Sequence, residues 1–405
     1  MHIITLTEQQ YNNYSKIHSK RNYKQTIEYA NMMQKSGYKK LYLGLIDDND
    51  NVIGATLILG KNIYTKYKIG YAPNGFLINF ENKTLLENFT KELKKYLSQL
   101  NFIYIRLNPN FAYRIYDKNN LVIKCYPNIL DEMKNLGFIH HGFEQNFNRF
   151  NAILNIENSL NDTYKKFNRN IKRKINDGKL MGITFHKSDN INDFYELIAK
   201  KAKKSIDYYQ DLKTYFNNEN TKFELYFAKM DSNTFLTNSH NLLTEEKKIN
   251  FDLQEKIKDI NISKTKKLLN DKMASDKRLN KYQNLVIKSS NIYSKYPNEL
   301  MIATCAIIKT DNTIYFIEEG YNDKLRDIHS LSILKWEIIK KYSKLGYKNF
   351  NLGTIPPLKN IDNKYYGIYL SKIGFNPRIY EYSGTFDLVI NRYIYAIIKN
   401  LPKKK

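Results

Sequence analysis

The stretch LMIATCAIIKTDNTIYFIEEG, residues 300–320, places two runs of apolar and β-branched residues on either side of a polar centre. β-Branched and aromatic residues favour strands, and an Asp-Asn pair between two such runs favours a turn. The turn falls at Asp311-Asn312, so the stretch is predicted to form a β-hairpin. Residues 39–60, KKLYLGLIDDNDNVIGATLILG, predict a second hairpin with an Asp/Asn turn.

Each hairpin is followed by the same order of elements: a helix, an apolar strand, and a helix that ends at a Gly-Phe pair. These segments are residues 82–100, 101–109 and 128–138 after the first hairpin, and 327–346, 347–356 and 365–375 after the second. A degenerate internal repeat of this kind indicates two similar units. The sequence therefore predicts an α+β protein of two halves, each with a mixed sheet and flanking helices.

The segment 242–293 differs from both halves because it is highly charged and contains neither Gly nor Pro. Apolar residues recur in it at three- and four-residue spacing, from Leu242 to Ile260 and again from Leu279 to Tyr293. This pattern predicts an antiparallel coiled-coil helical arm inserted in the second half. The expected domains are 1–145 for the first half, 146–236 with 296–405 for the second half, and 237–295 for the arm.

The chain of 405 residues carries 65 Lys+Arg against 40 Asp+Glu, a formal net charge of +25. This excess favours a polyanionic partner such as nucleic acid, a nucleotide-linked substrate or an anionic membrane surface, although compositional bias towards Lys is an alternative. Only Cys125 and Cys305 are present, which predicts a reducing compartment. The sequence shows no signal peptide and no apolar run of ~20 residues. We expect a cytoplasmic protein, and a peripheral position at the inner face of the plasma membrane stays open.

Three groups of residues are candidates for contacting an anionic substrate: two on predicted helices, described here, and Lys372, described below. On a helix over 164–180, YKKFNRNIKRKINDGKL, residues Lys165, Arg169, Lys172 and Arg173 share one face and suit phosphate oxygens. Lys204 precedes Tyr208 by one helical turn. A solvated helix face explains both patterns equally well.

Lys372, in the stretch YYGIYLSKIGFNP (365–377), is a cation among apolar neighbours. It is either a surface lysine of an amphipathic helix or a cation held for a substrate.

Several classes of site find no support in the sequence. His140, His141 and His186 have no companion ligands, so no metal is expected. No P-loop, nucleophile elbow or dinucleotide glycine pattern is present. The nearest approach to an acetyl-CoA pyrophosphate loop, QKSGYK at 34–39, has the wrong last residue and precedes the first strand instead of following one.

Three segments together carry a resemblance to a known family. They are YKKFNRNIKRKINDGKL (164–180), LKWEIIKKYSKLGYKNFNLGTIP (334–356) and GIYLSKIGFNPRIYEYSGTFDLVIN (367–391). Over nearly its whole length the chain resembles the FemABX family of tRNA-dependent aminoacyltransferases, which build peptidoglycan side branches. The resemblance implies two GNAT-like halves, in some members with a coiled-coil arm. It also implies transfer of an aminoacyl group from tRNA to the stem-peptide amino group of a lipid-linked or UDP-linked peptidoglycan precursor. Aminoacyl-tRNA is then a co-substrate, and no cofactor or metal is used.

The resemblance also assigns roles to individual residues. Lys372 matches the family's active-site lysine, which contacts the precursor's phosphates or the reacting ester, and is the expected catalytic residue. Lys204 and Tyr208 match a substrate-binding cation and a Tyr one turn later, and Tyr321 falls near another site Tyr. Arg169 and Lys172 lie on the matching basic helix and are expected to bind substrate.

The chain departs from the family pattern at three positions. The family often has Asp-Pro where this chain has Asn108-Pro109, a substrate-binding Lys at the position of Met33, and an acidic residue at the position of Thr385. No general base is therefore assigned at Asn108. Two alternatives follow from the residues: a CoA-dependent N-acyltransferase on the same scaffold, and a non-catalytic protein that binds tRNA or envelope precursors.

Overall fold

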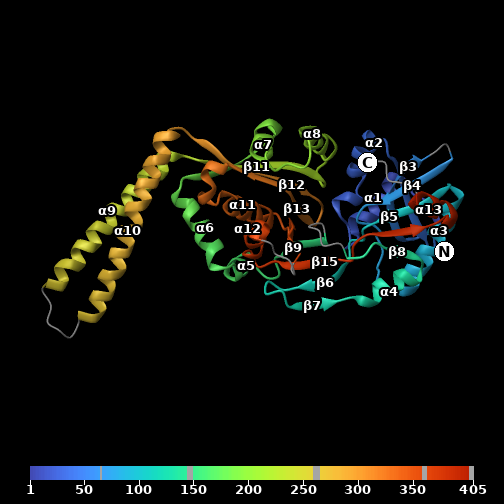
Figure 1. Ribbon diagram of the computed structural model, residues 1–405, viewed down its shortest axis with the longest axis horizontal. Coiled ribbons are helices and arrows are strands. Elements are labelled where there is room, and N and C mark those ends of the chain that lie inside the picture. The colour runs from blue at the N-terminus through green and yellow to red at the C-terminus, as the bar shows by residue number, and fades with distance from the viewer. Residues whose placement is uncertain (64–65, 144–148, 259–264, 358–362, 401–405) are drawn as a thin grey trace.

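The structure is a computed structural model that describes residues 1–63, 66–143, 149–258, 265–357 and 363–400. These residues form two mixed sheets with flanking helices, and a pair of long helices projects from one end (Figure 1). The first sheet has the order β1 (His2–Thr5), β2 (Lys39–Ile46), β3 (Val52–Ile63), β4 (Tyr67–Ala72), β5 (Phe102–Leu107), β16 (Phe386–Val389) and β8 (Phe138–His140). The second has the order β10 (Ile183–Ser188), β11 (Lys222–Met230), β12 (Leu300–Lys309), β13 (Thr313–Tyr321), β14 (Asn349–Thr354), β9 (Phe150–Asn155), β15 (Arg378–Tyr382), β6 (Ala112–Tyr116) and β7 (Val122–Cys125).

Helices surround both sheets, and most begin at a Ser, Thr or Asn cap whose side chain accepts a backbone N–H, as helix N-termini require. Their bounds are α1 (Glu8–Ile17), α2 (Ile27–Lys35), α3 (Lys83–Gln99), α4 (Pro127–Asn135), α5 (Leu160–Lys166), α6 (Arg169–Leu180), α7 (Ile191–Ile198), α8 (Ile206–Tyr215), α9 (Ser232–Lys258), α10 (Thr265–Lys295), α11 (Ser330–Lys344), α12 (Asn363–Ile373) and α13 (Arg392–Asn400), with the 3-10 turns η1 (Tyr23–Gln25) and η4 (Asp323–Ile328).

The predicted repeat of two mixed α/β units is confirmed, but it is offset by one strand. In the first half, β2, β3 and β4 run antiparallel, α3 crosses over, and β5 returns parallel to β4. In the second half, β11, β12 and β13, then α11 and β14, repeat this order. The hairpin at 300–320 therefore corresponds to β3–β4, and the sequence reasoning missed β4. The assignment of the halves as GNAT-like stays a prediction.

The offset explains where the projecting helices are inserted. In the first half β2 and β3 are joined by a tight turn, in which Asp47 accepts backbone N–H groups from Asn49 and Asn51. In the second half the corresponding connection, between β11 and β12, contains α9 and α10. A hairpin end tolerates a long insertion because the insertion leaves the sheet intact.

Helices α9 and α10 pack antiparallel over their described lengths. Near the sheet the Ser232 hydroxyl donates to the Tyr296 carbonyl at 2.5 Å, and further out Arg278 Nε donates to Glu246 at 2.8 Å. Ile249, a member of the expected apolar spacing, is 46% exposed, whereas the polar Glu246 and Asn250 are buried and bonded to the opposite helix. The expected connection at 259–264 lies outside the described residues, and the coiled coil stays a prediction.

The two sheets exchange strands across residue 145, where a domain boundary was expected. Strand β6 pairs with β15 in the second sheet, with Tyr116 opposite Ile379. Strand β16 pairs with β5 in the first sheet, with Phe386 opposite Leu107. The domain ranges stay a prediction, but each half is completed by strands from the other side of that boundary.

Three apolar cores hold this arrangement together. One lies between the first sheet and α3, and another lies between the second sheet and α11. The third joins the halves, because it combines Tyr42 and Leu57 of the first sheet with Phe223 and Tyr315 of the second, under α2, α7 and α8. No helix in the described part of the chain is long and apolar enough to cross a membrane.

Asp387 fastens the returning strand β16 to the first sheet. Its carboxylate is fully buried and accepts two hydrogen bonds from Arg106, at 2.8 and 2.9 Å, and one from the Tyr395 hydroxyl at 3.0 Å. Burial alone would raise the pKa of this carboxyl, but the bonds from Arg106 outweigh it and lower the pKa to about 2. The ionised form is thus favoured by folding.

We predict that Asp387→Asn lowers the free energy of unfolding by about 3 kcal/mol, because it leaves Arg106 without its partner. The ionised Asp387 carboxylate should contribute fully to the free energy of unfolding above its unfolded pKa of ~4, and this contribution should be lost as pH falls through about 2. Urea denaturation of both proteins at neutral and acid pH measures this difference.

Glu157→Gln is the control, because the Glu157–Arg378 pair is about half exposed on both sides. Exposed pairs contribute little, so this variant should unfold within ~1 kcal/mol of the wild type. Equal losses for the two variants would contradict the assigned role of Asp387.

Candidate active site

The site begins where β13 and β14 stop pairing. These parallel strands form only three residue pairs, the last of which is Tyr315 with Asn351. Beyond it β13 stays paired with β12, and β14 stays paired with β9 through a register shift between Asn351 and Thr354. Gly353 lies in this shift with φ +85°, which a residue with a side chain rarely adopts. The carboxyl ends of the two strands therefore diverge.

Lys372, on α12, places its ammonium group at this divergence. Nζ donates to the Thr354 carbonyl at 2.9 Å, and a Cβ on Gly353 would lie only 3.0 Å from Nζ. Burial lowers the pKa of the Lys372 ammonium to about 8, against the opposing effect of Glu319. Lys372 is therefore not a snorkelling surface lysine but a cation held at the ends of two strands.

Two carboxylates of β13 surround this ammonium without pairing with it. Glu319 pairs with the buried Lys335 of α11 at 2.9 Å. Glu318 accepts a hydrogen bond from the Tyr209 hydroxyl at 3.1 Å, and burial raises the pKa of Glu318. Within the described residues, Nζ of Lys372 has the Thr354 carbonyl as its one hydrogen-bond partner. An ammonium has three donors, so two remain for a substrate.

Helix α8 brings Tyr208 towards the same carboxylates. Burial raises the pKa of the Tyr208 phenol, and Tyr23 and Glu318 raise it further. Because Glu318 also acts on Lys372, the structure brings Tyr208 and Lys372 to one strand, β13. Lys204 is exposed on the surface, with Nζ 5.1 Å from the centre of the Tyr208 ring. It lies before the helix rather than one turn inside it, because α8 begins after Ser205.

Tyr321 is the last residue of β13, close in sequence to Glu318 and Glu319. Its ring is covered by the ammonium group of Lys201, which lies 4.1 Å from the ring centre. Lys201 is held there by Asp323 at 3.3 Å. Tyr321 thus belongs to the same end of β13, but a lysine of the protein already contacts its ring.

Arg169 and Lys172 lie on the surface next to the end of α12. The helix predicted over 164–180 is interrupted, because Asn168 caps the new helix α6 and separates it from α5. The Asn168 N–H donates to the Gly374 carbonyl at 2.9 Å, which fixes the start of α6 beside the turn after Lys372. Arg169 is exposed, and Lys172 donates to the Lys165 carbonyl at 2.6 Å. Neither residue pairs with the Lys372 cluster among the described residues.

The first half contributes a group of tyrosines that faces α8. Tyr29 of α2 is buried beside Tyr23, Tyr71 and Tyr208, which together with burial raise the pKa of its phenol. Asn108 accepts a hydrogen bond from the Tyr71 hydroxyl at 3.1 Å. Met33 packs against the core that joins the halves. Asn108, at the position where the family often has an Asp, thus orients the phenol of Tyr71.

The sequence reasoning missed Glu318, Glu319, Lys335 and Tyr71. Two adjacent carboxylates at the end of the apolar strand IYFIEEG were a visible signal. Lys335 and Tyr71 gave none, because their partners lie far away in the sequence. Among the described residues, no group of three or more His, Cys, Asp or Glu side chains is placed to hold a metal ion.

The depressed pKa of Lys372 leads to a prediction about stability. Unfolded lysine titrates near ~10.4, so between pH 8 and 10 the unfolded chain binds more protons at this position than the folded chain. The free energy of unfolding of the wild type should therefore rise over this range relative to Lys372→Met, and the difference should be constant below it. Urea denaturation of both proteins at pH 7, 8, 9 and 10 measures the effect, and a difference that does not change with pH would contradict it.

Comparisons with known proteins agree with this architecture. The family model described as "FemAB family" matches residues 6–403. The chain is 24% identical over 398 residues to "Aminoacyltransferase FemA" of Staphylococcus aureus (strain MW2), covering 94% of this chain and 93% of that protein. It is 24% identical over 380 residues to the protein of the same name from Staphylococcus epidermidis (strain ATCC 35984), covering 91% of each.

A solved structure shares the fold over the whole chain. "Crystal structure of FemX" superimposes with a TM-score of 0.73 at 18% identity, covering 99% of this chain and 100% of that one. At this identity the match speaks for the fold alone, but the family model extends over almost every residue. The chain therefore belongs to the FemAB family.

Proposed function

We propose that this protein transfers an aminoacyl group from aminoacyl-tRNA to the stem-peptide amino group of a peptidoglycan precursor, and so builds the interpeptide bridge of the cell wall. That it is an aminoacyltransferase follows from its family and from the names of its relatives. The observation that carries the finer proposal is the ammonium of Lys372, held with two donors unused where β13 and β14 diverge.

The chemistry follows from the charge that develops during transfer. The aminoacyl ester is already activated, so attack by a neutral amine forms a tetrahedral intermediate directly, with negative charge on the former carbonyl oxygen. Collapse of this intermediate forms the amide and breaks the ester C–O bond, and the ribose hydroxyl of tRNA leaves with the proton that the amine has lost. A donor fixed at that oxygen lowers the barrier, because it is oriented before the charge appears. Lys372 is proposed as this donor, and its pKa of about 8 leaves it mostly protonated at neutral pH.

The proton of the attacking amine also needs an acceptor. Glu318 lies near both Lys372 and Tyr208, and burial raises the pKa of its carboxyl, which makes the carboxylate a better proton acceptor. No carboxylate is available at Asn108, which is bonded to Tyr71. Glu318 is therefore proposed as the acceptor, and Tyr208 as a second donor near the ester.

The remaining residues are proposed to bind the substrates. Lys204, just before α8, and Tyr208 on α8 are proposed to contact the precursor together with Tyr29 of α2, which lies beside Tyr208. Arg169 and Lys172 are placed to meet the phosphates of an anionic substrate that approaches α12. Tyr321, the last residue of β13, is also proposed to contact the substrate. No cofactor or metal enters the proposed reaction, in which aminoacyl-tRNA is a co-substrate.

The projecting helices α9 and α10 are proposed to be a coiled-coil arm that contacts tRNA. Lys247, Lys248 and Lys256 on α9 and Lys266 and Lys267 on α10 are exposed, whereas Lys264 lies outside the described residues. We place the protein in the cytoplasm. A lipid-linked acceptor would bring it to the inner face of the plasma membrane, which its charge of +25 would favour.

We predict that Lys372→Met lowers the rate of transfer roughly 10²–10³-fold while tRNA binding changes little, because the ammonium acts mainly on charge that develops in the transition state. Single-turnover transfer from charged tRNA to a UDP-linked or lipid-linked precursor measures the rate, and filter binding measures affinity.

Lys95→Met is the matched control, because Lys95 is an exposed lysine on α3 of the first half. It should transfer at the wild-type rate. Normal turnover by Lys372→Met would remove Lys372 from the mechanism. Wild-type protein that consumes acetyl-CoA in place of charged tRNA would refute the proposed function itself.

The arm gives a separate prediction. Replacing Lys247, Lys248 and Lys256 together with Gln should weaken tRNA binding and reduce the slope of log affinity against log salt by about 2–3, since each phosphate contact contributes roughly 0.9. Affinities measured between low and moderate salt provide the slope.

The control for the loss of overall charge is a triple replacement of Lys91, Lys95 and Lys118. Lys91 and Lys95 are exposed on α3, and Lys118 is exposed in the turn between β6 and β7. An identical slope for the two triple variants would show that the arm does not contact tRNA.

A further inference from the structure

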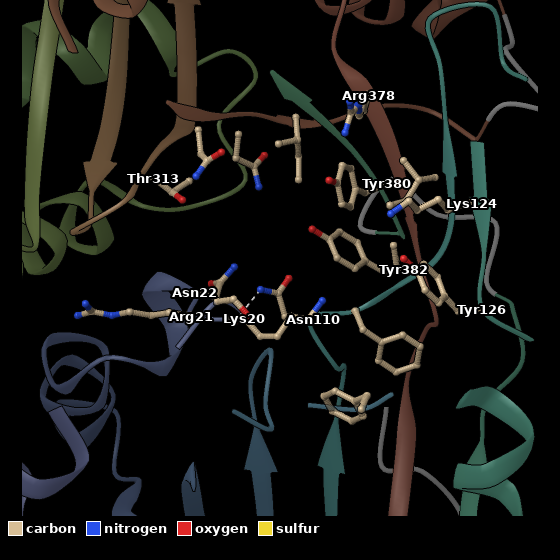
Figure 2. A pocket seen from close by; sticks show the side chains of 18 of the residues that line it. Lys20, Arg21, Asn22, Asn110, Lys124, Tyr126, Thr313, Arg378, Tyr380 and Tyr382 are labelled. Carbon is tan, nitrogen blue, oxygen red and sulfur yellow. Dashed lines mark hydrogen bonds between the residues drawn. The ribbon is translucent and has the colours of Figure 1, made fainter. Parts of the chain in front are cut away.

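A cavity of about 370 Å³ lies between the two halves, on the face of the second sheet that α11 does not cover. Strands β14, β9 and β15 and the β6–β7 hairpin form one wall, and loops of the first half at Lys20, Phe80 and Asn110 form the other (Figure 2). Its volume is within the ~300–1,000 Å³ typical of small-molecule sites. None of the residues proposed above as catalytic or substrate-binding lines it.

The cavity is separated from the α2–α8 side by two packed rings. Tyr315 lines the cavity, and its ring lies against Tyr23 with centres 5.2 Å apart. Tyr23 in turn contacts Tyr29 on the side of α2. The cavity is therefore a second compartment of the junction between the halves and not an extension of the tyrosine group around Tyr208.

Four cationic residues line the cavity, Lys20, Arg21, Lys124 and Arg378, against one acidic residue, Glu81. Lys20 and Lys124 form no ion pair among the described residues, and burial lowers the pKa of the Lys20 ammonium. Arg378 keeps donors in excess of its pair with Glu157. In Figure 2 the Lys124 side chain points into the space. The balance of charge in the cavity favours an anionic ligand.

Arg21 also lines the cavity, but its guanidinium group does not point into it. Its guanidinium pairs with Asp311 in the turn of the β12–β13 hairpin, and in Figure 2 it points away from the space. Its backbone carbonyl accepts a hydrogen bond from the Tyr315 hydroxyl at 3.2 Å. Arg21 therefore fastens the loop that carries Lys20 to the second sheet.

Aromatic rings and amides make up much of the remaining lining. Tyr380 and Tyr382 of β15 turn their hydroxyl ends into the space, and Tyr126 stands beside them (Figure 2). The amide of Asn155 donates to Asn349 at 2.6 Å, while its oxygen accepts no hydrogen bond within the described residues. Rings offer stacking faces to a planar base, and amides can pair with its polar edge.

We propose that this cavity binds a nucleoside phosphate, with the phosphate among Lys20, Lys124 and Arg378 and the base against the β15 tyrosines and the asparagine amides. Two substrates of the proposed function contain such a unit: the 3′ end of tRNA and the nucleotide of a UDP-linked precursor. The role of the site in transfer therefore rests on that proposed function, whereas nucleotide binding does not.

The position of the cavity connects it to Lys372 along one strand. Asn351 lines the cavity, and its side chain accepts a hydrogen bond from the Gly353 N–H at 2.9 Å. Gly353 is the residue whose Cα faces the Lys372 ammonium. A nucleotide in the cavity thus lies at one end of β14 and the ammonium at the other, which suits a substrate held by its nucleotide and reacting further along.

The test is nucleotide binding to the full-length protein, measured by calorimetry at fixed salt. The probes are AMP, UMP and the trinucleotide CCA, with inorganic phosphate as the anion alone. We expect at least one nucleotide to bind tenfold or more tightly than phosphate, because stacking of a base contributes roughly that factor. Preference for AMP and CCA identifies the tRNA end, and preference for UMP identifies the nucleotide-linked precursor.

Two variants locate the binding. Lys124→Glu reverses an exposed charge of the cavity, and Tyr380→Leu removes a ring from it; each should weaken nucleotide binding tenfold or more. Lys118→Glu is the matched control, because Lys118 is exposed on the same hairpin but does not line this cavity, and it should bind within twofold of the wild type.

Nucleotides that bind no more tightly than phosphate, or that bind Lys124→Glu and Tyr380→Leu like the wild type, would overturn the proposal. Lys372→Met separates it from the proposed function, because this variant should bind nucleotides normally. If transfer fails in every assay while nucleotides still bind the cavity, the nucleotide site stands without the transferase function.

Discussion

The candidate site depends on holding an ammonium group where two parallel strands part. β13 and β14 stop pairing after Tyr315 and Asn351, and the Thr354 carbonyl then becomes the partner of Lys372. Desolvating a cation is costly, and the pKa of about 8 reports that cost. Two contacts allow the ammonium to stay there without an ion pair. Gly353 leaves room for Nζ because it has no side chain, and Glu319 pairs with Lys335 instead of with Lys372. The result is a cation with donors to spare.

The position of that cation is set by contacts far from it. α12 ends at Ile373, and the Cα of the next residue, Gly374, lies so close to Ile171 of α6 that a Cβ would approach it to 2.4 Å. Phe375 is fully buried against Phe167, which fixes the turn after Lys372. The chain then runs through β15 into the first sheet, where Asp387 is held by Arg106. One continuous segment thus links the ammonium to the cores of both halves, so the two faces of the junction keep a defined separation.

The junction has two compartments because each half covers only part of the other. α2 and α8 meet on one side and enclose the tyrosines around Tyr208. On the other side β14, β9 and β15 are left without a helix over this face, and the loops of the first half stop short of them, which leaves the cavity. Tyr23 and Tyr315 form the wall between the compartments. Lys372 stands at the end of β14, beside Gly353 and Thr354.

The sequence by itself determined the repeated α/β order and the helical insertion, because alternation, helical spacing and turn residues are local properties of the chain. Those patterns left Lys372 open between a surface lysine and a substrate-binding cation, and its proposed role came from the family resemblance. It did not determine the offset of the repeat, since β4 is short and contains two polar or glycine positions that weaken its pattern. Only the tertiary structure decided that β6, β7 and β16 cross between the sheets, that Glu318 and Glu319 lie near Lys372, and that a cavity lies between the halves. The exchanged strands pair with residues more than a hundred positions away, and the carboxylates near Lys372 come from a different element of the chain, so no local pattern in the sequence records either contact.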